Sequence, residues 1–290
     1  MMRRARSFGA IATVYARVRP GYPPDGISWL IEGLQSPGTT GIAAALRPVV
    51  SPAPAEEPRG TFGTSRSTRS RSGQCSPGES PRRWRVLDLG AGTGALTRAL
   101  VARGFDVVAV EPDPEMRAVL VEQAPGADVR AGSAEDLPVD DAEFDAVLGA
   151  QMWHWVRLAP AVTEVARVLR RGGSFGLLWN LRDERVRWIG ELGRILGGED
   201  THSGAAHVVL PAGSPFTATA ARDFPWSHEL APGDIVDLVA TRSHVQVQSE
   251  SDRAELLSRV TELVATHPDT AGKARVVVRY VCSCWRATRI

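Results

Sequence analysis

The most informative segment of this chain is Val86-Leu87-Asp88-Leu89-Gly90-Ala91-Gly92-Thr93-Gly94. Its first half has the apolar composition of a buried strand, and a helical pattern begins directly after its last glycine. Glycines in such a turn allow a ligand to approach the backbone at the carboxyl end of a sheet. The segment therefore predicts a strand, a ligand-binding loop and a helix, in that order.

Apolar strands and amphipathic helices alternate along the chain after this segment. We predict strands at residues 86–89, 107–110, 127–131, 144–149 and 175–179, and helices at 95–102, 114–123 and about 158–169, with Gly172-Gly173 ending the last helix. This alternation, with nearly continuous apolar strands, is typical of a parallel sheet covered on both faces. The later part predicts helices at 184–196, from 234, and at 252–265, with strands near 224–230 and 276–285.

Composition divides the chain into three regions. Residues 1–35 predict two short helices joined by a proline-rich corner, which together form an N-terminal helical cap. Residues 36–83 are rich in Pro, Ser and Arg and lack apolar periodicity, so we predict a disordered insertion. A nucleic-acid or phosphorylation role for its arginines is the less favoured alternative, because no aromatic residues or lysines are interleaved. Residues 84–290 form the predicted core.

Charge and composition exclude several classes of protein. The 290 residues include 34 basic and 33 acidic side chains, a net charge of +1, which argues against a surface built for nucleic acid. No apolar run is long enough to span a membrane, and the basic start lacks the apolar region of a secretory signal. Three cysteines without a CxxC pair predict neither a disulfide framework nor a metal site. We expect a cytoplasmic protein with reduced thiols, Cys282 and Cys284 being half-buried.

Two carboxylates indicate which ligand the glycine loop binds. Gly90, Gly92 and Ala95 also satisfy the pattern of a dinucleotide site, which by itself is a weak signal. Asp88, however, would attract a cationic group and repel a pyrophosphate, and Glu111 follows Gly90 by 21 residues, where it can bind two ribose hydroxyls. A ribose and an ammonium without phosphate describe S-adenosylmethionine (SAM). An NAD(P)-dependent oxidoreductase and a SAM-binding regulatory protein without catalysis remain the alternatives.

These residues resemble the class I SAM-dependent methyltransferases, in particular the small-molecule group that includes the ubiquinone/menaquinone and trans-aconitate types. The resemblance is strongest from Val86 to Trp179, and residues 8–23 and 179–183 also match. It implies a Rossmann-like three-layer α/β sandwich with a seven-stranded, mostly parallel sheet whose last strand is antiparallel. It also implies transfer of the SAM methyl group by in-line displacement to a small-molecule acceptor, with a carboxylate or hydroxyl oxygen favoured.

The resemblance assigns cofactor contacts residue by residue. Those next to the methionine part are Asp88, Gly90, Ala91, Gly92 and Gly94. Glu111 is similar to the family's ribose carboxylate, and Pro112 to a residue beside the adenine. Ser133, Ala134 and Glu135 fall in the segment that contacts the adenine edge, and Gln151 lies in the loop that lines the methyl-transfer cavity.

The acceptor side is predicted from the aromatic and polar residues near this loop. His154 is either a general base for a substrate hydroxyl or a structural histidine, two interpretations of equal weight. The predicted pocket residues are Tyr15, Arg19, Trp153, Trp155 and Trp179. No Asn/Asp-Pro-Pro-Tyr/Phe segment follows the fourth strand, so we expect no nucleic-acid acceptor.

Overall fold

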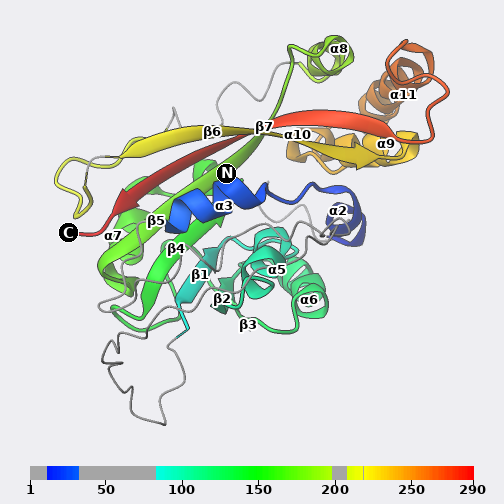
Figure 1. The fold of residues 1–290 in the computed structure, drawn as a ribbon. Helices are drawn as coiled ribbons and strands as arrows, with labels where there is room; N and C mark the ends of the chain where they lie inside the picture. The colour runs from blue at the N-terminus through cyan, green and yellow to red at the C-terminus, as the bar shows by residue number, and fades with distance from the viewer. Residues whose placement is uncertain (1–11, 33–82, 198–207, 218) are drawn as a thin grey trace, which may run out of the picture. The chain divides into compact units, whose positions relative to one another are not determined.

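A seven-stranded sheet organises the protein (Figure 1). The computed structural model describes residues 12–32, 83–197, 208–217 and 219–290. The strand order is β3-β2-β1-β4-β5-β7-β6, and every neighbouring pair is parallel except those made by β7, which is antiparallel to β5 and β6. The strands are β1 Arg85–Leu89, β2 Asp106–Val110, β3 Asp128–Arg130, β4 Phe144–Ala150, β5 Leu169–Arg182, β6 Ala220–Leu230 and β7 Val276–Thr288. The predicted fold, including the antiparallel last strand, is confirmed.

The helices connect these strands and flank the sheet. They are α2 Ala12–Val18, α3 Pro24–Ile31, α5 Ala95–Val101, α6 Pro114–Gln123, the 3-10 helix η2 Trp153–Trp155, α7 Leu158–Val168, α8 Arg187–Ile195, α9 Pro232–Ala240, α10 Ser243–Gln246 and α11 Glu250–Thr266. The start of α6 shows how local sequence sets a boundary. Asp113 accepts hydrogen bonds from the amides of Glu115 and Met116, and Pro114 occupies the first helical position. The limits of α6 agree with the predicted 114–123.

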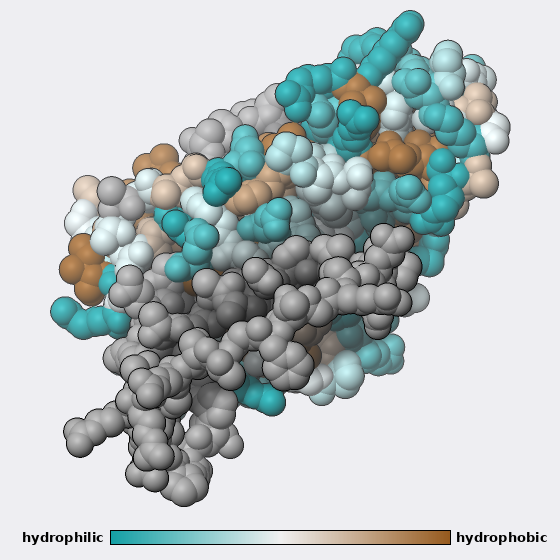
Figure 2. Space-filling model, viewed as in Figure 1, coloured by the Kyte–Doolittle hydropathy of each residue, from teal (hydrophilic) through white to brown (hydrophobic). Residues whose placement is uncertain are grey.

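Side chains alternate between two apolar layers on the two sheet faces. Leu87, Phe144 and Phe175 pack on the face covered by α7, whereas Val86, Leu148 and Leu178 pack on the face that α3 and α5 cover. A further apolar cluster joins α8, α9 and α11 to the ends of β6 and β7. The visible surface over α8 and α11 is mostly hydrophilic with small apolar patches (Figure 2), as expected for helices that bury one face.

The predicted helix at about 158–169 agrees with α7, but the predicted start of the fifth strand is wrong. We predicted that Gly172-Gly173 would end a helix, but α7 ends at Val168 and β5 begins at Leu169, so both glycines lie within the strand. The register with β4 shifts between Phe144 and Ala146, and Gly172 has a φ of +77°. Glycine accommodates such an irregularity because it lacks a side chain.

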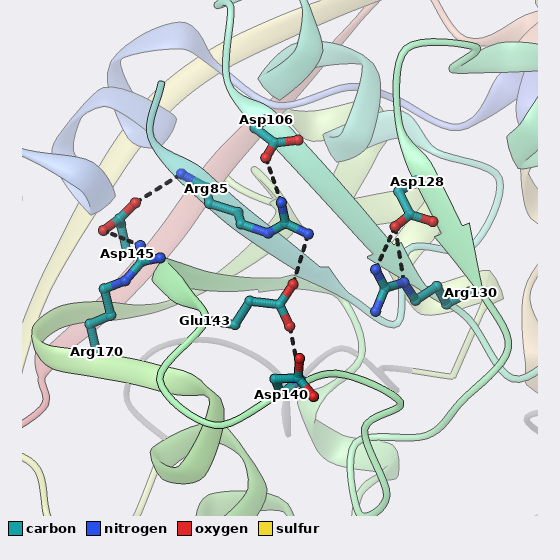
Figure 3. A network of polar contacts seen from close by, with 8 residues as sticks. All are labelled: Arg85, Asp106, Asp128, Arg130, Asp140, Glu143, Asp145 and Arg170. Carbon is teal, nitrogen blue, oxygen red and sulfur yellow. Dashed lines mark hydrogen bonds and ion pairs between the residues drawn. The ribbon is translucent and has the colours of Figure 1, made fainter. Parts of the chain in front are cut away.

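Ion pairs tie together the strands at their amino ends (Figure 3). Arg85, the first residue of β1, contacts Asp106 at 2.8 Å and Glu143 at 2.7 Å. Asp145 accepts hydrogen bonds from the Arg85 amide at 2.9 Å and from Arg170 at 2.6 Å. These opposite charges compensate one another at the amino edge of the sheet. Ligands of open α/β sheets bind at the opposite edge, where the strands have their carboxyl ends.

Several predictions concern features away from this edge. The insertion predicted at 36–83 lies outside the described residues except for Arg83, as does Cys75. Cys282 and Cys284 are fully buried rather than half-buried, with their Sγ atoms 3.7 Å apart. Among the helices described, none is long and apolar enough to cross a membrane.

Candidate functional site

The candidate site lies at the carboxyl edge of β1, β2 and β4. Leu89 pairs with Val110 on one side and with Gly149 on the other, so the loops after these three strands start at one level. The chain order reverses at β1, because β2 and β3 lie on one side and β4 and β5 on the other. Ligands of open α/β sheets bind at such a switch point.

The glycine loop after β1 combines close packing with an open position. Gly90, Gly92 and Gly94 all have positive φ, which other residues rarely adopt. Gly94 has a φ of +89°, and a Cβ on it would lie 2.5 Å from Leu120 Cδ1, so the loop packs closely against α6 at this glycine. A Cβ on Gly92 would meet no atom within 4 Å. The space in front of Gly92 is therefore available to a ligand.

Asp88 places a buried carboxyl group at the base of this loop. Asp88 is 1% exposed, and its Oδ2 atom accepts a hydrogen bond of 2.6 Å from Thr97 Oγ1. Oδ1 is buried and has no hydrogen-bond partner among the described residues. Burial raises the pKa of Asp88 from 3.8 to about 7, against the opposing effect of the Thr97 hydrogen bond. Such a carboxyl group is suited to a cationic partner.

Glu111 is held at the end of β2 by backbone amides. Gly92 N donates to Oε2 at 2.9 Å, and Asp113 N donates to Oε1 at 2.9 Å. Burial raises the pKa of Glu111, and the two amide hydrogen bonds counteract that effect. Each carboxylate oxygen retains a lone pair, so the group can still accept hydrogen bonds from hydroxyls.

The residues predicted beside the adenine have different surroundings. Pro112 is exposed, and its carbonyl accepts from Arg117 at 2.8 Å. Ser133 forms an isolated β-bridge with Asp136, and Ala134 is buried in the apolar layer. Glu135 accepts a hydrogen bond of 2.7 Å from the backbone amide of Arg157. Glu135 thus holds the start of α7, and Ala134 offers a ligand only its backbone.

The loop after β4 contacts the glycine loop. A Cβ on Gly90 would lie 3.0 Å from Met152 side-chain atoms. Gln151 has a φ of +58°, and its Nε2 donates to the Asn180 carbonyl at 3.2 Å. Gln151 therefore links the ends of β4 and β5, and its strained backbone is typical of functional sites.

The tryptophans predicted for the acceptor pocket lie in two different places. Trp153 and Trp179 are buried in the layer covered by α7, where the Trp153 ring lies 5.1 Å from Phe175. Trp155 is half-buried beside His154, at 4.8 Å between ring centroids, and His154 is exposed. Neither ring of this second pair lines the pocket that contains Arg19 and Gln151.

The N-terminal helices border a pocket next to Gln151. Helix α2 lies against α6 and α9, and its Arg17 pairs with Asp234 and Asp237. Arg19 lies over the Tyr15 ring at 4.5 Å and donates to Thr241 Oγ1 at 3.1 Å. The pocket is lined by Arg19, Pro20, Gln151, Asn180, Arg182, Leu192, Ile235, Leu238, Val239, Arg242, Val278 and Tyr280. Of the predicted site residues, Arg19 and Gln151 come together here.

Sequence reasoning missed most of this pocket. Arg182 falls in the segment 179–183 whose resemblance was noted, but no pattern joins it to Arg242, 60 residues later. The two meet because β5 and α9 end at the same place, which no local signal reveals.

Comparison with known proteins gives a consistent result. A family model described as a methyltransferase domain matches residues 87–177. An uncharacterized methyltransferase of Mycobacterium tuberculosis is 42% identical over 282 residues, 97% of this chain and 95% of the relative. An uncharacterized methyltransferase-like protein of Schizosaccharomyces pombe is 33% identical over 67% of this chain and 78% of its own length. A solved Anaeromyxobacter dehalogenans structure, described as a candidate type II methyltransferase, has a similar fold, with a TM-score of 0.57, 21% identity, and coverage of 93% and 97%.

Proposed function

Because this chain belongs to the class I SAM-dependent methyltransferases, we propose that it transfers the SAM methyl group to an oxygen of a small-molecule acceptor. Family membership also decides a choice that the glycine pattern had left open. The protein is a methyltransferase that uses SAM, and the NAD(P)-dependent oxidoreductase alternative is dropped.

The observation that carries the proposal at residue level is the environment of Asp88. A buried carboxylate oxygen without a hydrogen-bond partner among the described residues costs free energy unless a ligand supplies one. The ammonium of the methionine part of SAM is a partner of the required charge. The open space in front of Gly92 would admit the chain that carries this ammonium.

The remaining cofactor contacts follow from the same edge of the sheet. Glu111 would accept hydrogen bonds from the ribose hydroxyls while Gly92 and Asp113 hold it in place. We propose that Pro112, Ser133 and Ala134 border the adenine, the last through its backbone. Gln151 would lie between the cofactor and the acceptor, since its side chain already contacts the end of β5.

When bound, SAM supplies a methyl group on a sulfonium centre whose leaving group is already activated. An acceptor oxygen would take this methyl group, and sulfur would keep the electron pair of the broken carbon–sulfur bond. The protein's task is to hold oxygen, carbon and sulfur in line and to exclude water. Such positioning can lower the activation free energy by on the order of 7 to 11 kcal/mol. A carboxylate needs no base, whereas a hydroxyl would pass its proton to a group such as His154.

Calorimetric titration tests the proposal. We expect SAM and S-adenosylhomocysteine (SAH) to bind the wild-type protein and NADH not to bind. Asp88→Ala and Glu111→Ala should each weaken SAM binding at least about tenfold. Asp106→Ala is the matched control, because Asp106 begins the strand β2 that Glu111 follows and lies at the opposite edge.

One result would contradict the residue assignments, and another would contradict the proposed catalysis. If both site variants bound SAM as tightly as Asp106→Ala does, the cofactor would lie elsewhere. Binding of SAM without turnover across a panel of carboxylic acids and alcohols would favour the alternative of a SAM-binding protein without catalysis.

A further inference from the structure

The pocket between the N-terminal segment, β5, α9 and β7 has a chemical character that the cofactor does not require. Resting on the proposed function, we propose that it binds the methyl acceptor, and that this acceptor carries an anionic group and an apolar body. The lining residues come from elements outside the glycine loop, so the pocket is distinct from the candidate cofactor contacts except at Gln151.

Positive charge dominates the polar part of the pocket. Arg19, Arg182 and Arg242 line it, and none of the described residues in the lining is acidic. The Arg182 side chain is only 6% exposed, and it forms an ion pair with the exposed Glu184 at 3.5 Å. A guanidinium buried to this extent is stabilised by an anion in the adjacent space. Arginine is also the side chain that best matches a planar carboxylate or a phosphate.

The acidic residues of α9 pair with an arginine that does not line the pocket. Asp234 and Asp237 pair with Arg17 on α2, on the side of α9 that faces that helix. Ile235, Leu238 and Val239 of the same helix line the pocket instead. Helix α9 therefore presents carboxylates to α2 and an apolar surface to the pocket.

Apolar side chains from other elements complete this wall. Leu192 of α8 and Val278 of β7 add to the three residues of α9, so five aliphatic side chains line the pocket together with the arginines. A pocket with an apolar wall and a few positively charged groups is suited to an amphiphile, which is oriented by its charge and held by its apolar part.

The position of the pocket agrees with an acceptor site. Gln151 directly follows β4, and Asn180 lies two residues before the end of β5, at the carboxyl edge where the cofactor loops also lie. An acceptor anchored by the arginines would thus have its remaining part directed along the edge of the sheet toward Gln151. Arg19 is already oriented by Thr241 and Tyr15, so it needs little reorganisation to bind an anion.

Octanoate is a suitable probe, with 1-octanol and octylamine as neutral and cationic counterparts and octyl phosphate as the alternative anion. Binding to the wild-type protein loaded with SAH is measured by calorimetry. We expect octanoate or octyl phosphate to bind at least about tenfold more tightly than octanol, and octylamine not to bind. The tighter of the two anions identifies the head group.

Arg242→Gln removes one charge from the pocket, and Arg19→Gln is a second variant in case the first fails to fold. Each should weaken binding of the anion at least about tenfold and leave octanol binding unchanged. Arg187→Gln is the matched control, because Arg187 lies on α8 with an 83% exposed side chain and does not line the pocket.

The outcomes separate this inference from the proposed function. If SAH binds but neither anion binds better than octanol, the acceptor inference is overturned and the methyltransferase site stands. Equal binding of the anion by the wild type and both pocket variants would also overturn it. Failure of SAH itself to bind, with the probe anions binding as expected, would instead contradict the proposed cofactor site.

Discussion

The backbone amide of Gly92 donates a hydrogen bond of 2.9 Å to Oε2 of Glu111. Gly92 belongs to the loop after β1 and Glu111 to the end of β2, so this bond joins the two parts of the candidate cofactor site. The second oxygen of Glu111 is held by the amide of Asp113, which caps α6. One carboxylate thus couples the glycine loop, the ribose position and the start of a helix.

Glu111→Gln should disturb both binding and stability. Glutamine has one acceptor oxygen, so one of the two amides would face an NH2 group and lose its partner. We expect SAM affinity to fall at least about tenfold and the free energy of unfolding to fall by about 1 to 3 kcal/mol. Calorimetry and urea unfolding measure the two effects. Asp106→Asn, at the other end of β2, should change neither by more than a small amount, and an equal effect of both variants would refute the assignment.

Gly92→Ala, compared with Gly104→Ala, distinguishes loss of space for the ligand from the cost of backbone strain. Gly92 has a φ of +57° and Gly104 a φ of +81°, and a Cβ on either meets no atom within 4 Å. Both alanine variants should therefore lose a similar unfolding free energy, about 1 to 2 kcal/mol. Only Gly92→Ala should weaken SAM binding, by about tenfold or more, because its methyl group enters the space proposed for the ligand. Unchanged SAM affinity would show that the ligand does not approach Gly92.

Asp88 should make the unliganded protein less stable as the pH rises. Its folded pKa of about 7 lies above the ordinary value of 3.8, because the charged form is buried. Between these values the folded state keeps a proton that the unfolded state has lost, so the unfolding free energy decreases with rising pH and levels off above about pH 7. The total change is on the order of a few kcal/mol. Urea unfolding from pH 4 to 8 should show this slope in the wild type and less of it in Asp88→Asn. Parallel curves would disprove the assignment.

His154→Gln tests which kind of acceptor needs a base. A carboxylate is already ionised at neutral pH, so kcat with a carboxylic acid acceptor should change by less than about threefold. With a hydroxyl acceptor, loss of a general base should lower kcat by about a hundredfold or more. Steady-state kinetics and the pH profile of kcat distinguish the two cases. A large loss with a carboxylic acid acceptor, or no loss with a hydroxyl acceptor, would contradict this role.

Local sequence was sufficient for the elements around the cofactor site. The apolar run at 86–89, the glycines after it and the Asp113-Pro114 cap act through residues within a few positions of one another. Their conformations are therefore readable from the chain, and the β1 loop and α6 lie where they were predicted. The boundary at Gly172 was misjudged because long-range pairing outweighs the local preference of glycine for a turn. Leu169 and Ser174 on either side of the glycines pair with β4, and both glycines share backbone hydrogen bonds with Arg289.

The amino-acid sequence by itself determined the order of strands and helices, the glycine loop, and the identity of the two carboxylates that follow β1 and β2. Only the tertiary structure decided that Arg19, Arg182 and Arg242 share one pocket, that Trp153 and Trp179 are buried in the apolar layer, and that the acids of α9 pair with Arg17. The physical reason is that backbone preferences act over a few residues, whereas a pocket is made by side chains that sheet pairing and helix packing bring together from distant parts of the chain.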